Sequence, residues 1–152
     1  MGVHLEHRTF TILRDLPGSP SHAFRFWAEH DLKRLWTSCH PTWSVLQDDF
    51  DFRLGGSERV RWRMPDGIEQ GFVAHFLEIA PGDRLIYAYA MTTDHVPISS
   101  SLVTVELVPQ GGTTRMTMTE QAAFATVAIA DQRENGTGIG FDRLVAILAA
   151  EA

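Results

Sequence analysis

The stretch from residue 51 to residue 87 constrains the fold of this 152-residue chain more than any other, because polar and apolar residues alternate through it. Arginines alternate with large apolar side chains from Arg59 to Met64, and a second alternating run extends from Gln70 to Phe76. The Met-Pro-Asp-Gly segment at 64–67 separates the two runs. Period-two runs joined by such a turn predict an antiparallel meander.

One face of this predicted meander is unusually bulky. It carries Trp62, Met64, Phe72 and Phe76. Side chains of this size cannot be covered by the sheet that bears them. A helix, or a helix together with a guest molecule, must therefore lie against this face.

Composition and charge narrow the choice of partners. The formal net charge is -6, and phosphate binding needs a concentrated basic surface, so we expect no nucleic acid partner. The alternating Arg59, Arg61 and Arg63 are best interpreted as the solvated face of a strand. Aromatic residues and five methionines predict a core of large, adaptable side chains.

The chain carries no sign of secretion or membrane insertion. Cys39 is the single cysteine, so an intrachain disulfide is impossible. Residues 1–9 lack a basic segment followed by an apolar one, and no apolar run is long enough to span a bilayer. We therefore expect a cytoplasmic location and no membrane partner.

Turn residues and periodicity predict the order of elements. A first strand at 10–14 is followed by a helix that begins at Ser19-Pro20, with Ser as the N-cap, and by a short helix from Asp31 that ends before Pro41. Six strands follow, and only one of their connections, at 92–98, is long. The predicted strands lie at 42–52, 57–64, 69–79, 84–91, 99–108 and 113–121.

The last element, at about 131–150, is predicted to be an amphipathic helix. Its apolar residues fall at i, i+3, i+4 and i+7, namely Phe141, Leu144, Val145 and Leu148. Gly136, Gly138 and Gly140 each cost about 1 kcal/mol relative to Ala in a helix interior. Close approach of the helix to a sheet, or a frayed first turn, would explain them.

Together these elements predict an α+β fold in which a curved antiparallel sheet grips the C-terminal helix. We expect one domain over residues 1–152, because the chain has no repeat and no linker. Curvature requires bulges, which Gly55-Gly56 and Gly71 are placed to provide. Such a sheet does not pack flush along a helix, so a cavity between them is expected.

At this point the sequence resembles a known family. The matching segments, in order, are Ser19–Trp27, Leu32–Trp36, Asp51–Gly56, Pro65–Gly67, Gly71–Pro81, Arg84-Leu85, Gly112–Glu120 and Gly140–Leu144. They are similar to proteins related to the C-terminal domain of the activator of heat shock protein 90 ATPase, in the START-like (SRPBCC) superfamily that includes polyketide cyclases. The resemblance implies a helix-grip fold, START-like or Bet v1-like, with a deep hydrophobic cavity, but no single activity.

The residues expected to line that cavity and bind a ligand are mostly aromatic. They are Trp36, Trp43, Trp62, Met64, Phe72, Phe76, Tyr87, Tyr89, Met116, Met118, Glu120 and Phe141. Glu120 continues the face of Met116 and Met118, where desolvation would raise the pKa of its carboxyl. It is a candidate polar anchor or catalytic acid, with Arg14 as a partner; alternatively, it has left the sheet and meets water.

The histidines and the single cysteine are weaker candidates for a functional site than Glu120. His95 in the long connection is the histidine placed best for ligand contact at the cavity rim, although a solvated loop histidine is the more ordinary interpretation, and His75 is expected to face solvent. Cys39 is interpreted as a part-buried thiol. His4 and His7 do not supply the four converging ligands of a structural metal site, so no metal and no cofactor are expected.

Three classes of function remain open from the sequence. The leading hypothesis is a binding module that holds a small hydrophobic or amphipathic molecule between sheet and helix. The second is a cavity enzyme of the cyclase or hydrolase type, in which Glu120, a tyrosine or His95 supplies acid-base catalysis. The third is a homodimeric interaction module whose cavity is vestigial.

Overall fold

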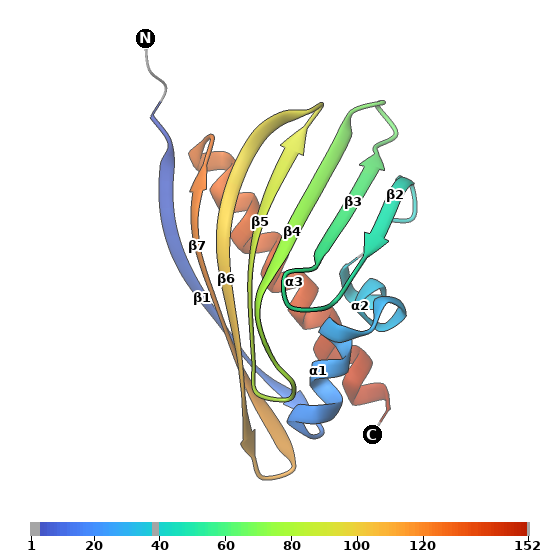
Figure 1. Cartoon of the computed structure of the whole chain (residues 1–152), viewed down its shortest axis with the longest axis vertical. Coiled ribbons are helices and arrows are strands. Elements are labelled where there is room, and N and C mark those ends of the chain that lie inside the picture. The colour runs from blue at the N-terminus through green and yellow to red at the C-terminus, as the bar shows by residue number, and fades with distance from the viewer. Residues whose placement is uncertain (1–3, 38–39, 152) are drawn as a thin grey trace.

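The structure, a computed structural model, describes residues 4–37 and 40–151, in which seven strands form a single antiparallel sheet accompanied by three helices (Figure 1). The strands are β1 (Glu6–Pro17), β2 (Ser44–Phe50), β3 (Ser57–Arg63), β4 (Glu69–Ala80), β5 (Arg84–Thr93), β6 (Val96–Gln110) and β7 (Thr113–Phe124). The helices are α1 (Pro20–Ala28), α2 (His30–Thr37) and α3 (Val127–Ala150). The predicted α+β helix-grip architecture is confirmed.

The order of strands across the sheet is β1-β7-β6-β5-β4-β3-β2. Consecutive strands therefore neighbour each other, except that β1 closes the far edge beside β7. Figure 1 shows α3 running behind this sheet, with α1 and α2 beside its C-terminal half. Ion pairs tie β1 to α3: Arg8 lies 2.6 Å from Asp131 and 3.9 Å from Glu134, and Arg14 lies 2.9 Å from Asp142.

The bulges that bend the sheet do not lie at Gly55-Gly56 or Gly71, where the sequence analysis predicted them. The register shifts between Val45 and Gln47, between Phe76 and Glu78, and between Met91 and Thr92. Gly71 keeps a regular register opposite Thr92, where a Cβ atom would come within 2.5 Å of the threonine Oγ1. This glycine permits a close approach beside a bulge in the neighbouring strand pair and makes no bulge itself.

Helices α1 and α3 each begin directly after a residue whose side chain caps the helix N-terminus. Ser19 Oγ accepts a hydrogen bond from the His22 amide at 3.2 Å, and Pro20 occupies the first helical turn as predicted. Thr126 caps α3 in the same way, accepting from the Ile129 amide at 3.1 Å. Helix α3 therefore begins four residues before the predicted start, because its N-cap lies ahead of the visible apolar period.

The prediction of a long connection at 92–98 is wrong. Strands β5 and β6 form a hairpin whose two turn residues, Asp94 and His95, have φ values of 47° and 65°. Positive φ at both positions matches the twist of a two-residue hairpin. The turn was missed because it lacks the glycine that usually marks such a conformation. Strand β1 also extends beyond the predicted 10–14 to Glu6–Pro17, paired throughout with β7.

The core between the helices and the sheet is built on stacked rings. Trp36 lies 5.3 Å from Phe141 and 5.4 Å from Trp27, measured between ring centroids. The Trp36 Nε1 also donates to the Phe26 carbonyl at 2.8 Å. These contacts join α1, α2 and α3 into one layer on the concave side of the sheet.

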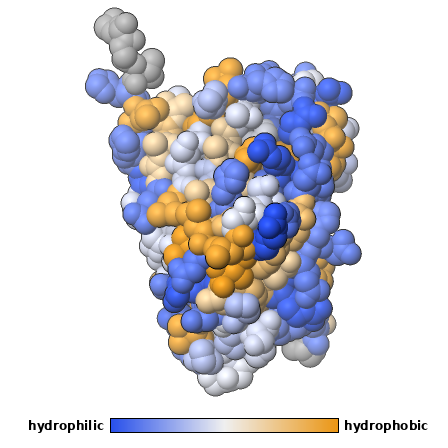
Figure 2. All heavy atoms as spheres, in the orientation of Figure 1, coloured by the Kyte–Doolittle hydropathy of each residue, from blue (hydrophilic) through white to orange (hydrophobic). Residues whose placement is uncertain are grey.

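The opposite face of the sheet is mixed in character. Figure 2 shows a cluster of apolar side chains on this outer face, surrounded by hydrophilic ones. Exposed apolar side chains of the strands include Leu13, Leu77, Leu102 and Val108. None of the helices in the described part of the chain is long and apolar enough to cross a membrane.

Candidate functional site

A cavity of about 640 Å³ lies between the concave face of the sheet and α3. Its aromatic lining consists of Trp36, Trp43, Trp62, Phe72, Tyr87, Tyr89 and Phe141. Its aliphatic lining includes Val60, Met91, Ile98, Met118, Ile129 and Ile139. Its charged lining consists of Lys33, Arg34, Glu58, Glu120, Arg133 and Arg143. The cavity is therefore mainly apolar, with charged groups gathered at a few points.

The cavity is closed at one end and open at the other. Tyr89, Met118 and Glu120 are buried lining residues, whereas His40, Gly136 and other lining residues of α3 are exposed. The opening thus lies beside the middle of α3 and the segment that precedes β2.

Nine of the twelve residues expected from the sequence line this cavity. They are Trp36, Trp43, Trp62, Phe72, Tyr87, Tyr89, Met118, Glu120 and Phe141. Phe76 and Met116 are instead fully buried in the core, and Met64 follows the end of β3 in the turn. Period-two alternation identifies the inner face but not which part of it a helix covers. That the nine bind a ligand stays a prediction.

The glycines of α3 have a different role from the one predicted. Gly136, Gly138 and Gly140 lie well inside the helix, which excludes a frayed first turn. A Cβ at Gly136 would have no atom within 4 Å, which excludes close packing there, whereas a Cβ at Gly140 would lie 3.8 Å from Trp36. Gly136 and Gly140 both line the cavity. Four residues apart, they share one helix face. The missing side chain of Gly136 leaves open space beside the cavity.

Glu120 lies at the closed end and is only 1% exposed. Its Oε2 accepts hydrogen bonds from the Tyr89 hydroxyl and the Ser101 hydroxyl, each at 2.7 Å. The Arg133 Nη1 lies 3.7 Å from the same oxygen and donates to the Tyr89 hydroxyl at 2.8 Å. Glu120 therefore remains in β7 and faces the cavity rather than bulk water.

The partner of Glu120 differs from the one expected. Arg14 pairs with Asp142 at 2.9 Å, and Arg133 of α3 takes the place beside Glu120. Arg133 was missed because a lone arginine near the start of a helix usually points to solvent. Its spacing from Gly136 and Gly140, at i+3 and i+7, is the signal that could have placed it on the cavity face.

Burial is the largest influence on the pKa of the Glu120 carboxyl. Desolvation raises the pKa of the Glu120 carboxyl above its ordinary value, although hydrogen bonds from Ser101 and Tyr89 and the charge of Arg133 act in the opposite direction. Desolvation, followed by the charge of Glu120, likewise raises the pKa of the Tyr89 phenol. The site therefore holds a carboxyl that accepts a proton more readily than an exposed one.

A second buried cluster lies on the other side of the cavity. Glu58, 1% exposed, accepts from Lys33 at 2.6 Å through one oxygen and pairs with Arg34 at 2.7 Å through the other. Arg34 also pairs with Asp48 at 2.7 Å, and His30 lies 3.0 Å from that carboxylate. Desolvation lowers the pKa of Lys33, which is 5% exposed.

The sequence analysis did not identify this second cluster. Lys33 lies in the short helix predicted from Asp31, and the sequence analysis assigned it no role. One signal was present: Glu58 shares the period-two face of Val60 and Trp62, where a carboxylate needs a partner. The identity of that partner depends on how α2 packs against β3, which local periodicity does not encode.

Tyr87 lies between the two clusters. Its ring is 6.0 Å from the Tyr89 ring and 5.7 Å from the Lys33 Nζ. Desolvation raises the pKa of its phenol, and the charges of Tyr89, Glu120 and Glu58 add to the effect. Tyr87 lines the cavity, and no side chain of the described residues donates a hydrogen bond to its hydroxyl or accepts one from it. A polar atom of a guest molecule could satisfy it.

Other candidates lie away from the cavity. His95 is exposed in the β5–β6 turn and does not line the cavity, which contradicts its expected place at the rim. His75 is exposed on the outer face, as expected. Cys39 lies outside the described residues. The described part of the chain contains no group of three or more side chains arranged to hold a metal ion.

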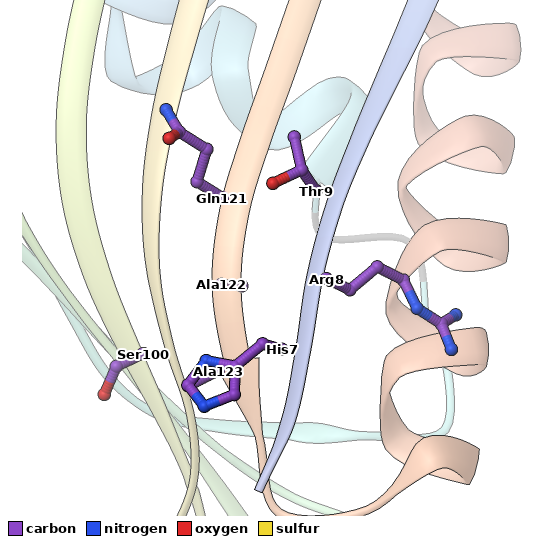
Figure 3. Close-up of a pocket in the computed structure, with 7 residues that line it drawn as sticks. All are labelled: His7, Arg8, Thr9, Ser100, Gln121, Ala122 and Ala123. Carbon is purple, nitrogen blue, oxygen red and sulfur yellow. The ribbon is translucent and has the colours of Figure 1, made fainter.

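A second hollow, of about 360 Å³, lies on the sheet near β1, β6 and β7. It is lined by His7, Arg8, Thr9, Ser100, Gln121, Ala122 and Ala123 (Figure 3). Figure 3 shows the Arg8 side chain turned toward α3 and away from His7. Its charge is already paired with Asp131. The hollow is smaller and more open than the inner cavity and contains no buried carboxylate.

Comparisons with known structures agree with this fold. A protein of Rhizobium leguminosarum is 38% identical, covers 97% of this chain and 97% of its own, and superimposes with a TM-score of 0.89. A protein of Rhizobium loti is 39% identical over 94% of this chain and 98% of its own, with a TM-score of 0.87. A Chromobacterium violaceum protein, 20% identical over 92% of this chain and 96% of its own, shares the fold with a TM-score of 0.74.

Two comparisons at the level of sequence bear on the family of this chain. A search of curated proteins gives no match. A family profile described as Activator of Hsp90 ATPase homolog 1-like protein matches residues 17–151, which include every helix and strand after β1. The chain therefore belongs to the Activator of Hsp90 ATPase homolog 1-like family.

Proposed function

We propose that this protein binds a small amphipathic molecule in the cavity between the sheet and α3. The observation that carries the proposal is the cavity itself: its volume of about 640 Å³ falls within the range of about 300–1,000 Å³ typical of small-molecule sites. Its lining combines many aromatic side chains with a few polar groups, which is the usual composition of such sites.

The glycines of α3 support the same proposal. A glycine inside a helix costs about 1 kcal/mol relative to Ala, and nothing near Gly136 requires its small size. Gly136 and Gly140 both border the cavity. The helix thus gives up stability at Gly136, where a larger side chain would occupy open space beside the cavity.

Tryptophan fluorescence and thermal shift test the proposal directly. Trp36, Trp43 and Trp62 line the cavity, so a bound molecule should change the emission of the protein as well as raise its melting temperature. The screen should contain hydrophobic and amphipathic compounds of fewer than about 25 heavy atoms, to suit a cavity of this size. Native mass spectrometry of the purified protein checks for a molecule already bound.

A pair of leucine variants separates binding in the cavity from binding elsewhere. Gly136→Leu places a side chain into open space beside the cavity and should abolish the shift caused by a hit compound. Asn135→Leu introduces the same side chain at a neighbouring exposed position that does not line the cavity, and should leave the shift unchanged. Equal shifts in the two variants would place the compound outside the cavity and contradict the proposal.

A second candidate function is catalysis in the same cavity, with Glu120 as a general acid or base. The observation that favours it is the buried Glu120 carboxyl, whose pKa is raised by desolvation and which lies at the closed end of a cavity. If a turned-over compound is found, Glu120→Gln should abolish turnover but retain binding. Unchanged turnover in this variant would exclude Glu120 as the catalytic residue.

The homodimer and the cytoplasmic location expected from the sequence remain predictions. Analytical ultracentrifugation of the purified chain measures the first. A monomer at micromolar concentration would remove the interaction-module alternative in its homodimeric form.

A further inference from the structure

The charges that line the cavity are not balanced. Four lining side chains are cationic and two are acidic, although the whole chain carries a net charge of -6. The cationic ones are Lys33, Arg34, Arg133 and Arg143, and the acidic ones are Glu58 and Glu120. The net charge of the cavity lining is therefore positive, whereas the net charge of the whole protein is negative.

Part of this excess is neutralised locally. Lys33 and Arg34 share Glu58, and Arg34 also pairs with Asp48, which stands behind the cavity wall. Two cations thus face two carboxylates within one connected cluster. This cluster satisfies its own charges and leaves no cation for a guest molecule.

The two arginines of α3 are compensated less well. Arg143 donates to the Trp36 carbonyl at 2.7 Å and has no carboxylate within 4.0 Å among the described residues. Arg133 donates to two neutral hydroxyls, those of Tyr89 and Ser99, each at 2.8 Å, and its nearest carboxylate oxygen, on Glu120, is 3.7 Å away. Each guanidinium has five N–H donors, so both retain hydrogen-bonding capacity.

Arg133 is the more effective of the two as an anion site. Its side chain is 12% exposed, so water weakens its charge interactions less than those of an exposed arginine. Tyr87 lines the same cavity without a side-chain hydrogen-bond partner among the described residues, and the charge of Arg133 acts on its phenol. A cation and a free O–H donor are thus available to one acceptor group.

From these contacts we infer that the bound molecule is an amphipathic acid, with its carboxylate or other anionic head at Arg133 and Tyr87 and its apolar body along Trp62 and Phe72. The inference rests on the proposed function and names the chemical class of the ligand. The anionic head accepts from the Arg133 guanidinium and from the Tyr87 hydroxyl. Charge-assisted hydrogen bonds of this kind are among the stronger ones in proteins.

Glu120 makes this binding depend on pH. The groups that face its carboxyl are Arg133 from α3, Tyr87 and Tyr89 from β5, and Ser101 from β6, while its β1 neighbour is the apolar Phe10. A second anion beside Glu120 opposes its ionised form, so binding of the acid is accompanied by proton uptake at Glu120. Affinity should fall as the pH rises through the pKa of Glu120.

The first test compares matched ligands by isothermal titration calorimetry. Three acids of different body size, dodecanoic, naphthylacetic and pyrenebutyric acid, are each titrated against their primary amides. We expect at least one acid to bind about tenfold or more tightly than its amide, as one charge-assisted hydrogen bond allows. Amides that bind as well as their acids would overturn the inference and leave the proposed function intact. If no member of any pair binds, both fail.

Three variants test where the head lies. Arg133→Gln should remove the preference for the acid and leave affinity for the amide unchanged, whereas the control Arg143→Gln, at the other cavity-lining arginine of α3, should keep the preference. Glu120→Gln should bind the acid with an affinity that no longer falls between pH 5 and pH 8. Retention of the preference in Arg133→Gln, or an unaltered pH dependence in Glu120→Gln, would overturn the placement. If Arg133→Gln does not fold, the pH dependence of Glu120→Gln alone tests the placement.

Discussion

Arg133 of α3 and Glu120 of β7 are joined through one hydroxyl group. The Tyr89 Oη accepts from Arg133 at 2.8 Å and donates to Glu120 at 2.7 Å, while the two charged groups themselves remain 3.7 Å apart. A tyrosine inserted into an ion pair in this way fixes both partners without bringing them into direct contact. The arrangement links the last helix to the interior of the sheet at the closed end of the cavity.

Glu120→Gln is expected to change how stability depends on pH. Because burial raises the pKa of Glu120 in the folded protein, the stability that this group contributes is fully present below its unfolded pKa and is lost as the pH rises through its folded pKa. Gln cannot ionise. The unfolding free energy of the variant relative to the wild type should therefore increase from pH 4.5 to pH 8.

Urea unfolding of both proteins across this pH range measures the effect. Asp131→Asn serves as a control because Asp131 is an exposed carboxylate of α3 that pairs with Arg8 and does not line the cavity. A difference between Glu120→Gln and wild type that stays constant with pH would show that Glu120 does not titrate in the way its burial implies.

The second prediction concerns the buried pair of Lys33 and Glu58. Lys33→Met should destabilise the protein by about 3 kcal/mol, because removing one partner of a buried pair leaves the other charge undercompensated. The double variant Lys33→Met, Glu58→Leu should recover most of this loss, since both charges are then replaced by apolar groups. Arg34 keeps Asp48 as its partner in the double variant.

Chemical denaturation of the two single variants and the double variant gives the coupling between these residues. A double variant that is as unstable as the sum of the singles would mean that Lys33 and Glu58 act independently. In that case the contact at 2.6 Å would contribute little to stability.

The third prediction concerns Gly136. A Cβ atom there meets nothing within 4 Å, so Gly136→Ala should stabilise the protein by about 1 kcal/mol through helix propensity. Gly138→Ala is a matched control outside the cavity, where the Cβ would lie 3.5 Å from the Arg14 Nη2, an ordinary contact distance. Thermal unfolding should show both variants melting above the wild type. A lower melting temperature for Gly136→Ala alone would reveal a contact at this position.

The fourth prediction concerns Trp36, which joins α2 to α1 and borders the cavity. Trp36→Phe removes the hydrogen bond to the Phe26 carbonyl and part of the ring contact with Phe141, and should cost about 2–3 kcal/mol. Trp43→Phe, a substitution of the same kind at a partly exposed lining residue, should cost less than about 1 kcal/mol. Similar losses in the two variants, measured by urea unfolding, would show that the Trp36 contacts do not hold the helices together.

Local patterns in the sequence predicted most of the fold. Alternation from Arg59 to Phe76 placed β3 and β4, and the spacing of Phe141, Leu144 and Leu148 placed α3. The aromatic residues of the cavity followed from the same patterns, because side chains two apart on a strand share a face. The Asp94-His95 turn did not follow, since its positive φ values are imposed by the twist of the paired strands.

The sequence by itself determined that a bulky concave sheet face must meet a C-terminal helix, because period and residue size are local properties of the chain. Only the tertiary structure decided which charged groups face each other. Arg133 reaches Glu120, and Lys33 reaches Glu58, across gaps set by sheet curvature and helix packing. Periodicity states which side of an element a residue occupies; it carries no information about what lies opposite, because that depends on the register and bend of every strand between them.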